Sequence, residues 1–238
     1  MSRSAPTAGT GADDAPDAMP GPTSELARQR VFPEHRFQFS AHQLCFMCKC
    51  LSDTRTLDGA IVEIGCEYGH TTVFLNNYID DLVGQDRPYY AIDTFSGFTD
   101  SDVRFEADNR GKQGIAYQDF KENRKEWFER TLRINRIQRV RAIEADINEF
   151  DLPSLGPLSF VLLDVDLYRP TRKALPELYE MLRPGGVLVV DDCNPASNQW
   201  DGAYQAYIEF VRTRNITPRI MYNKLGVLRK PLPEAAPS

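Results

Sequence analysis

Residues 158–194 read LSFVLLDVDLYRPTRKALPELYEMLRPGGVLVVDDCN, and this stretch decides the fold. Its first six residues are almost wholly apolar and predict a buried strand, and VLVV at 187–190 predicts a second one. Between them, leucines recur on one face of a helix predicted over 171–182. The run Arg183-Pro184-Gly185-Gly186 ends that helix and turns the chain. A strand, a helix and a strand in this order indicate two parallel strands joined by a crossover helix.

The same alternation continues on both sides of this stretch. Further strands are predicted over 59–64, 87–92 and 139–144, and further helices over 70–79, 117–132 and 204–214. Segments 218–222 and 226–229 are predicted to pair as a terminal hairpin. Strands separated by helices imply a mostly parallel sheet with helices on both faces. The predicted fold class is therefore α/β, and five such units followed by a hairpin match the Rossmann-like, seven-stranded sheet of class I methyltransferases.

Length and composition limit what this domain can do. A chain of 238 residues, 42% of them hydrophobic, suits one substantial domain with a tail. The net charge of −6 argues against a dedicated nucleic-acid binder, which needs a basic surface. No apolar run approaches the ~20 residues of a membrane span, and the start lacks the apolar core of a secretion signal. We therefore expect no nucleic-acid partner, no membrane association and a cytoplasmic location.

Four segments are expected along the chain. Residues 1–24 are rich in Ala, Gly, Pro, Ser and Thr without hydrophobic periodicity, which predicts a disordered tail. Residues 25–58 are predicted to be a helical segment, either a lid or a dimer element, so a homo-oligomer is left open. Residues 59–230 are predicted to form the methyltransferase domain, and 231–238 a C-terminal tail.

Three of the five cysteines, Cys45, Cys48 and Cys50, lie close together near His42. A zinc site normally needs four ligands, usually in separated pairs, and this segment looks helical and apolar. Core cysteines are therefore the preferred interpretation. An odd number of cysteines argues against a disulfide framework and favours a reducing compartment.

Ligands of parallel sheets bind beyond the carboxyl ends of the strands, so the residues there are candidates for binding. The first strand ends at Glu63, and the turn after it contains Gly65, Tyr68, Gly69 and Thr71. The two glycines allow a tight turn and a close approach of a ligand to the backbone. Their G-x-x-x-G spacing differs from the G-x-G-x-x-G of dinucleotide enzymes and is common in methyltransferases, although a structural turn would also explain it.

Acids at the ends of the next two strands extend this predicted site. Asp93 ends the second strand, where a carboxylate can accept both hydroxyls of a ribose. Thr94 and Ser96 continue along the same edge. Asp146 follows the third strand and is placed to meet an adenine amino group, with a helix cap as the alternative. Together these positions predict a site for the nucleoside of S-adenosylmethionine.

Four aspartates follow the two most apolar strands: Asp164, Asp166, Asp191 and Asp192. If the two strands are neighbours, the four carboxylates gather at one end of the sheet. They would then repel one another unless a cation or protonation relieves them. Oxygen ligands suit a hard ion, with Mg²⁺ as the default and Mn²⁺ or Ca²⁺ as alternatives. Exposed acids that cap the following helices are the competing interpretation.

The stretch from 162 to 193 resembles the macrocin O-methyltransferase (TylF-type) family, together with VEIGCEYGHTT at 62–72, AIDTFSGF at 91–98 and WDGAYQAYIEF at 200–210. The resemblance covers roughly 59–229. Members of that family are metal-dependent enzymes that methylate sugar hydroxyls, several of them in antibiotic biosynthesis. The family usually has an Arg-Gly-Gly-like turn after the first strand, where this chain has Glu67-Tyr68-Gly69-His70.

The resemblance also implies roles for individual residues. Asp164, Asp191 and Asp192 become metal ligands, with Asp164 also beside the methyl donor, and Asp166 becomes the catalytic base. The acceptor becomes a small-molecule hydroxyl, a sugar by preference, with Trp200 and Tyr204 at its border; packing over the sheet edge is the alternative for these two.

Three other functions compete with this one. A catechol-type O-methyltransferase shares the layout of acids but typically has a lysine base where this chain has Asp166. A non-catalytic methyltransferase-fold binding module would not need the full set of metal ligands. An NAD enzyme is disfavoured because the second close glycine is missing.

Overall fold

The computed structural model describes residues 37–83, 87–112, 117 and 120–233. The predicted tail at 1–24, the first part of the predicted helical segment 25–58, and residues 234–238 of the predicted tail 231–238 lie outside these residues. The described part begins before a helix, α2 (Ala41–Asp53), which falls inside that predicted segment.

A seven-stranded sheet runs through the described residues in the order β3-β2-β1-β4-β5-β7-β6. Its strands are β1 (Ala60–Ile64), β2 (Tyr89–Asp93), β3 (Val140–Glu144), β4 (Leu158–Leu163), β5 (Leu182–Val190), β6 (Ile220–Met221) and β7 (Leu225–Arg229). The first five are parallel, whereas β7 is antiparallel to both β5 and β6. The predicted α/β class and the terminal hairpin are confirmed.

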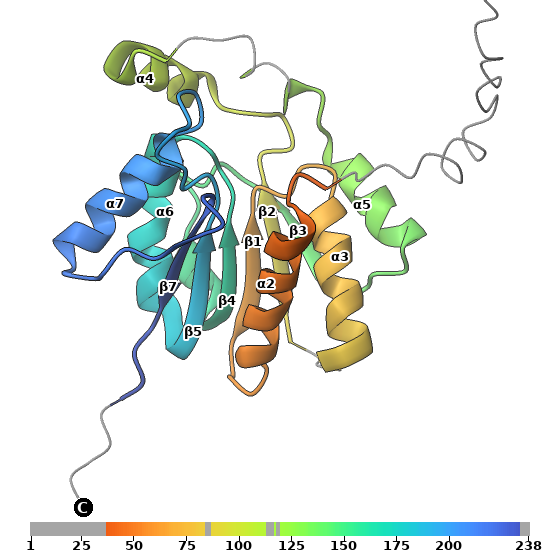
Figure 1. Cartoon of the computed structure of the whole chain (residues 1–238). Coiled ribbons are helices and arrows are strands. Elements are labelled where there is room, and N and C mark those ends of the chain that lie inside the picture. Colours follow the sequence, from red (N-terminus) through yellow and green to blue (C-terminus); the bar gives the residue numbers. More distant parts are fainter. Residues whose placement is uncertain (1–36, 84–86, 113–116, 118–119, 234–238) are drawn as a thin grey trace, which may run out of the picture. The chain divides into compact units, whose positions relative to one another are not determined.

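Helices cover both faces of this sheet (Figure 1). One face packs against α2, α3 (His70–Tyr78) and α5 (Lys125–Ile134), and α3 continues into a π-helical turn at Ile79–Val83. The other face packs against α6 (Tyr168–Met181) and α7 (Gly202–Thr213). Every residue of β4 is buried because Phe160 faces one core and Val161 the other. This is why the strand reads as a continuous apolar run.

Two helices differ from the sequence prediction. The helix predicted over 117–132 begins only at Lys125, because Arg124 has an extended backbone and Tyr117 packs into an aromatic cluster. Helix α4 (Asp100–Arg110) was not predicted. Its buried residues are acids, Asp102 and Glu106, so it lacks the apolar stripe that marks a helix in sequence.

The start of strand β5 also differs from the prediction. It begins at Leu182, five residues before the predicted start at Val187. Leu182 pairs with Leu158 of β4, and the Gly185 N–H donates to the Lys230 carbonyl. The Pro-Gly-Gly segment therefore belongs to the strand, with Gly185 at a φ of +84° where the pairing with β4 shifts register.

Two further expectations concern membranes and cysteines. None of the helices in the described ranges is long and apolar enough to cross a bilayer. Cys48 and Cys50 are buried in the core under α2, as preferred from the sequence, whereas Cys45 is exposed. All five cysteines are free thiols.

The carboxyl ends of β2, β1, β4 and β5 are tied together by a series of backbone hydrogen bonds. Gly65 donates to Ile92, Asp164 to Ile64, and Asp191 to Leu163, each at 2.8 Å. Each bond joins the residue just after one strand to the end of its neighbour. The residues that follow these strands therefore meet at one edge of the sheet.

Candidate active site

Two adjoining pockets open at this edge of the sheet. The larger has an empty volume of about 740 Å³ and is lined from the ends of β1, β2, β3 and β4; the smaller has about 360 Å³ and lies beside the turn after β1. Both are lined by Gln38, Gly65, Glu67 and Asp164. They therefore form one continuous cleft, of a size suited to a nucleotide-like ligand.

The turn after β1 depends on its two glycines. Gly65 has a φ of +80°, and a Cβ there would lie 1.7 Å from the Asp164 carbonyl oxygen. Gly69 has a φ of +82°, and a Cβ there would lie 2.9 Å from the Phe128 ring. Only glycine fits either position, so β1 and β4 can approach closely at the floor of the cleft.

Asp93 holds this turn in place. One of its carboxylate oxygens accepts hydrogen bonds from the N–H groups of Cys66 and Glu67, at 2.8 and 2.9 Å, and the other accepts from Phe95 at 2.8 Å. Asp93 also lines the larger pocket. A ribose contact, as predicted from the sequence, would add to these backbone bonds.

Glu63 lies below the smaller pocket and is 1% exposed. One carboxylate oxygen accepts from the Thr72 and Tyr89 hydroxyls, both at 2.7 Å. Burial raises the pKa of Glu63 to about 7, although the two hydroxyls oppose the shift. Thr71 and His70 line the same pocket, at the start of α3.

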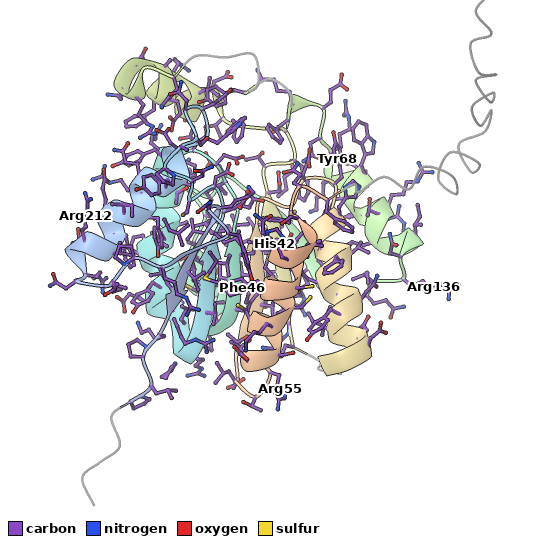
Figure 2. The ribbon with its side chains drawn as sticks, in the orientation of Figure 1. His42, Phe46, Arg55, Tyr68, Arg136 and Arg212 are labelled. Carbon is purple, nitrogen blue, oxygen red and sulfur yellow. The ribbon has the colours of Figure 1, made fainter. Side chains whose placement is uncertain are left out.

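Of the remaining residues predicted to bind the cofactor, some line the pockets and others do not. Asp146 and Thr94 line the larger pocket. Asp146 also caps a turn, since one oxygen accepts from the Asn148 backbone and side chain at 2.9 Å. The described lining of the two pockets does not include three predicted residues, Tyr68, Gly69 and Ser96. Tyr68 is one of the residues labelled in Figure 2. Its hydroxyl donates to the Glu122 carbonyl at 2.9 Å.

The four aspartates gather where β4 and β5 end. Asp164 and Asp166 line the larger pocket, and Asp191 is 3% exposed. Burial raises the pKa of Asp164 and Asp166 well above the usual range, and neighbouring carboxylates add to the shift. Asp166 also shares a hydrogen bond with the side chain of Asp192. Four carboxyl groups are therefore crowded together, as expected from the sequence for neighbouring strands β4 and β5.

Lys224, which the sequence did not suggest, contacts this cluster. Its Nζ lies 2.5 Å from an Asp191 oxygen and 2.6 Å from an Asp192 oxygen. Burial alone would lower the pKa of Lys224, but the surrounding aspartates raise it overall. A signal was present: β7 runs antiparallel to β5, so the residue just before β7 must lie at the carboxyl end of β5. Gln38 was also missed, and its surrounding sequence has no comparable signal.

Left-handed backbone conformations of residues other than glycine mark the rim of the cleft. They occur at Glu67 after β1, Phe95 after β2, Asp166 after β4 and Asp192 after β5, with φ between 45° and 56°. Such conformations are unfavourable and persist only where the surrounding structure enforces them. The Asp166 carbonyl, for example, accepts a hydrogen bond from Ala203 of α7 at 2.9 Å.

Helix α4 and the segment before α7 lie beyond the carboxyl ends of the strands (Figure 1), and Asp102 of α4 lines the larger pocket. Arg110 forms ion pairs with Glu106 at 2.7 Å and Asp201 at 2.6 Å, and it also contacts Gln205. Trp200 packs its ring against three other aromatic side chains: Phe98, Tyr117 and Phe120. Phe98 and Phe120 line the larger pocket, so this cluster borders the cleft. Tyr204, in the first turn of α7, packs against the core on that face of the sheet.

The sheet and its site together define a class of protein. A parallel sheet whose last inserted strand is antiparallel, with a glycine turn after β1 and acids at successive strand ends, is the fold of class I methyltransferases. The profile of the macrocin O-methyltransferase (TylF) family matches residues 46–227. The chain belongs to this family and is an S-adenosylmethionine-dependent O-methyltransferase.

Solved structures share the fold at low sequence identity. The O-methyltransferase NovP aligns with a TM-score of 0.67 and 17% identity, covering 83% of both chains. The calicheamicin methyltransferase CalS11 aligns with a TM-score of 0.65 and 19% identity, covering 94% of this chain and 99% of its own. An apo structure of CalS11, described as a TDP-rhamnose 3'-O-methyltransferase, aligns with a TM-score of 0.54. No curated protein sequence matches the chain significantly.

Proposed function

We propose that this enzyme methylates a hydroxyl group of a sugar or of a glycosylated natural product, with the help of a divalent cation, Mg²⁺ by default. One observation carries the proposal: the glycine turn, Asp93 and Asp146 line the same cleft as Asp164 and Asp166. A methyl donor bound along the first set would present its sulfonium group beside the second. The sugar as acceptor is supported by membership of the family and by the description of CalS11 as a TDP-rhamnose methyltransferase.

The residues at the ends of β4 and β5 suit a hard cation. Asp164, Asp191 and Asp192 offer only oxygen atoms, and Oδ1 of Asp191 is buried without a hydrogen-bond partner in the described structure. Within the described ranges, however, three or more acidic, His or Cys side chains do not already converge as a metal site. The chemistry of the donors therefore fits an ion, while the side chains would have to adjust. When bound, such an ion would lower the pKa of the acceptor hydroxyl.

The protein's own residues would bind the methyl donor, accept the proton and exclude water. The turn after β1 would hold the amino-acid end of the methyl donor in the smaller pocket, and Asp93 and Asp146 would fix the nucleoside. Asp166 would accept the hydroxyl proton as the methyl group arrives. The aromatic cluster around Trp200 would exclude water on the acceptor side. The five free thiols support a reducing location, for which we propose the cytoplasm.

Isothermal titration with S-adenosylmethionine, followed by turnover assays on a panel of nucleotide sugars and glycosides, tests the proposal. We expect binding in the micromolar range typical of cofactors, and turnover that EDTA abolishes and Mg²⁺ restores. A protein that does not bind S-adenosylmethionine would be a non-catalytic binding module. Turnover restricted to catechols would show that the sugar assignment is wrong.

A further inference from the structure

The ion pair between Lys224 and the Asp191–Asp192 pair joins residues more than thirty positions apart in the chain. The lysine side chain is 25% exposed, whereas the side chain of Asp191 is 4% exposed. Both distances, 2.5 and 2.6 Å, are those of charge-assisted hydrogen bonds. The ammonium group thus donates hydrogen bonds to two of the oxygens that would bind a divalent ion.

The position of Lys224 is fixed by its surroundings. It lies in the turn between β6 and β7, after two residues with left-handed backbone, Tyr222 and Asn223. Its carbonyl accepts a hydrogen bond at 2.6 Å from the N–H of Cys193, the residue that follows the aspartate pair. Its Nζ lies 5.4 Å from the centre of the Phe39 ring. The backbone of the turn is therefore fastened to the segment that holds the two acids.

The ammonium group of Lys224 and a divalent ion cannot both bind the oxygens of Asp191 and Asp192 at the same time. They would compete for the same oxygens, and two positive charges so close together in a site with little water repel strongly. Without any cation, however, the four carboxylates would repel one another. A lysine in this position relieves that repulsion when no metal is bound.

We propose that Lys224 is an internal counter-ion of the Asp191–Asp192 pair and that a divalent cation displaces it on binding. This inference rests on the metal site of the proposed function. Displacement moves the ammonium group away from the two carboxylates. The face of the Phe39 ring, which lies beside the group in this structure, offers it a neighbouring contact. Lys224 therefore weakens metal binding, while it stabilises the metal-free protein.

Binding of Mn²⁺ alone, measured by isothermal titration, tests the inference without any turnover assay. We expect Lys224→Met to bind Mn²⁺ at least about tenfold more tightly than the unmodified protein, because the competing charge is gone. The matched control is Lys230→Met, since Lys230 is 23% exposed and pairs with Glu180 at 2.9 Å, away from the cleft. This control should leave the Mn²⁺ affinity unchanged. Equal or weaker binding by Lys224→Met would overturn the inference.

A second measurement uses the unmodified protein and does not depend on how the variant folds. Lys224 should react slowly with acetic anhydride in EDTA and faster when Mn²⁺ is present, as followed by mass spectrometry of its peptide. Lys230 in the same sample gives the internal reference. An unchanged rate at Lys224 in saturating Mn²⁺ would show that the ion does not displace it.

The outcomes separate this inference from the proposed function. If Mn²⁺ does not bind, while S-adenosylmethionine binds and turnover persists in EDTA, the displacement of Lys224 and the metal requirement are both wrong but methyl transfer stands. If S-adenosylmethionine does not bind, the proposed function fails, and the comparison of Mn²⁺ affinities still decides the role of Lys224.

Discussion

Asp166 combines three properties at a single residue. Its backbone is left-handed, its carboxyl group lines the larger pocket, and it shares a hydrogen bond with Asp192. Burial and the neighbouring carboxylates raise its pKa, whereas a cation beside the cluster, such as Lys224, lowers it. Once it is deprotonated, a carboxylate with a raised pKa is also a stronger proton acceptor.

Asp166→Asn should therefore retain the binding of S-adenosylmethionine but reduce turnover by roughly 10²–10⁴-fold, the usual contribution of a general base. Calorimetry and a methyl-transfer assay measure the two effects. Asp108→Asn, an exposed change on α4, is the control and should alter neither. Undiminished turnover in Asp166→Asn would remove the residue from the mechanism.

Glu63 predicts a pH dependence of stability. Its pKa rises from 4.5, the ordinary value of a glutamate side chain, to about 7 in the folded protein, mainly through burial. The folded state therefore favours the protonated form, so the contribution of Glu63 is fully present below pH 4.5 and is lost as the pH rises to about 7. The loss amounts to roughly 3 kcal/mol.

Glu63→Gln should remove this dependence. Relative to the unmodified protein, the melting temperature of the variant should rise by several degrees between pH 5 and pH 8, as followed by circular dichroism. The exposed Glu149→Gln is the control, for which the difference should stay flat across this range. A flat difference for Glu63→Gln as well would mean that the carboxyl is ionised in the folded protein throughout.

At the scale of elements, the junction of β1 and β4 depends on Gly65. We expect Gly65→Ala to destabilise the protein by at least about 3 kcal/mol, because the new Cβ overlaps the backbone of Asp164 and must push the two strands apart. Gly111→Ala shares a positive φ but has no atom within 4 Å of the new Cβ, so it should cost only about 1 kcal/mol. Urea denaturation of both variants measures the difference. Similar losses in the two would contradict a steric role for Gly65.

The strands were predictable from sequence and helix α4 was not, for a physical reason. Burial on both faces leaves β4 and residues 187–190 of β5 almost wholly apolar, and such runs are easily recognised. Helix α4 instead buries Glu106, which accepts from the Tyr168 N–H at 2.8 Å and pairs with Arg110. Partners that are distant in sequence stabilise this helix, so its own residues show no apolar period.

The residues of the site also fall into two groups, those that could be placed from the sequence and those that could not. Residues directly after strands, such as Asp164 and Asp191, could be placed from sequence because parallel strands end at a common edge. Lys224 comes from a hairpin that the sequence predicts, but its place at the cleft depends on the docking of β7 beside β5. Gln38 comes from a segment whose sequence has no comparable pattern. The ribose contact of Asp93 stays a prediction. In this structure its carboxylate accepts hydrogen bonds from three backbone N–H groups.

At the scale of the whole described domain, Arg110 fastens α4 to the start of α7. Its side chain is 6% exposed, and its partners come from both elements. Arg110→Ala would leave Glu106 buried without its cation, which is strongly destabilising locally. Hydrogen exchange in α4 should become at least about tenfold faster, while exchange in α6 stays unchanged.

The control for this prediction is Arg104→Ala on the same helix, because Arg104 is exposed and its Nε donates to the Asp100 carbonyl within α4. It should leave the exchange rates of α4 as they are. If Arg110→Ala also leaves them unchanged, the attachment of α4 must rest on other contacts, such as that between Lys112 and Asp201.

The place of β7 between β5 and β6 has a consequence for the order of events during synthesis. While a ribosome is still making residues 225–229, the apolar edge of β5 has no partner and can pair with other chains. Lys224 immediately precedes this strand, so the same docking step that closes the edge also delivers the ammonium group to the aspartates. The nascent domain thus loses its exposed edge and its uncompensated charge together, once β7 has docked.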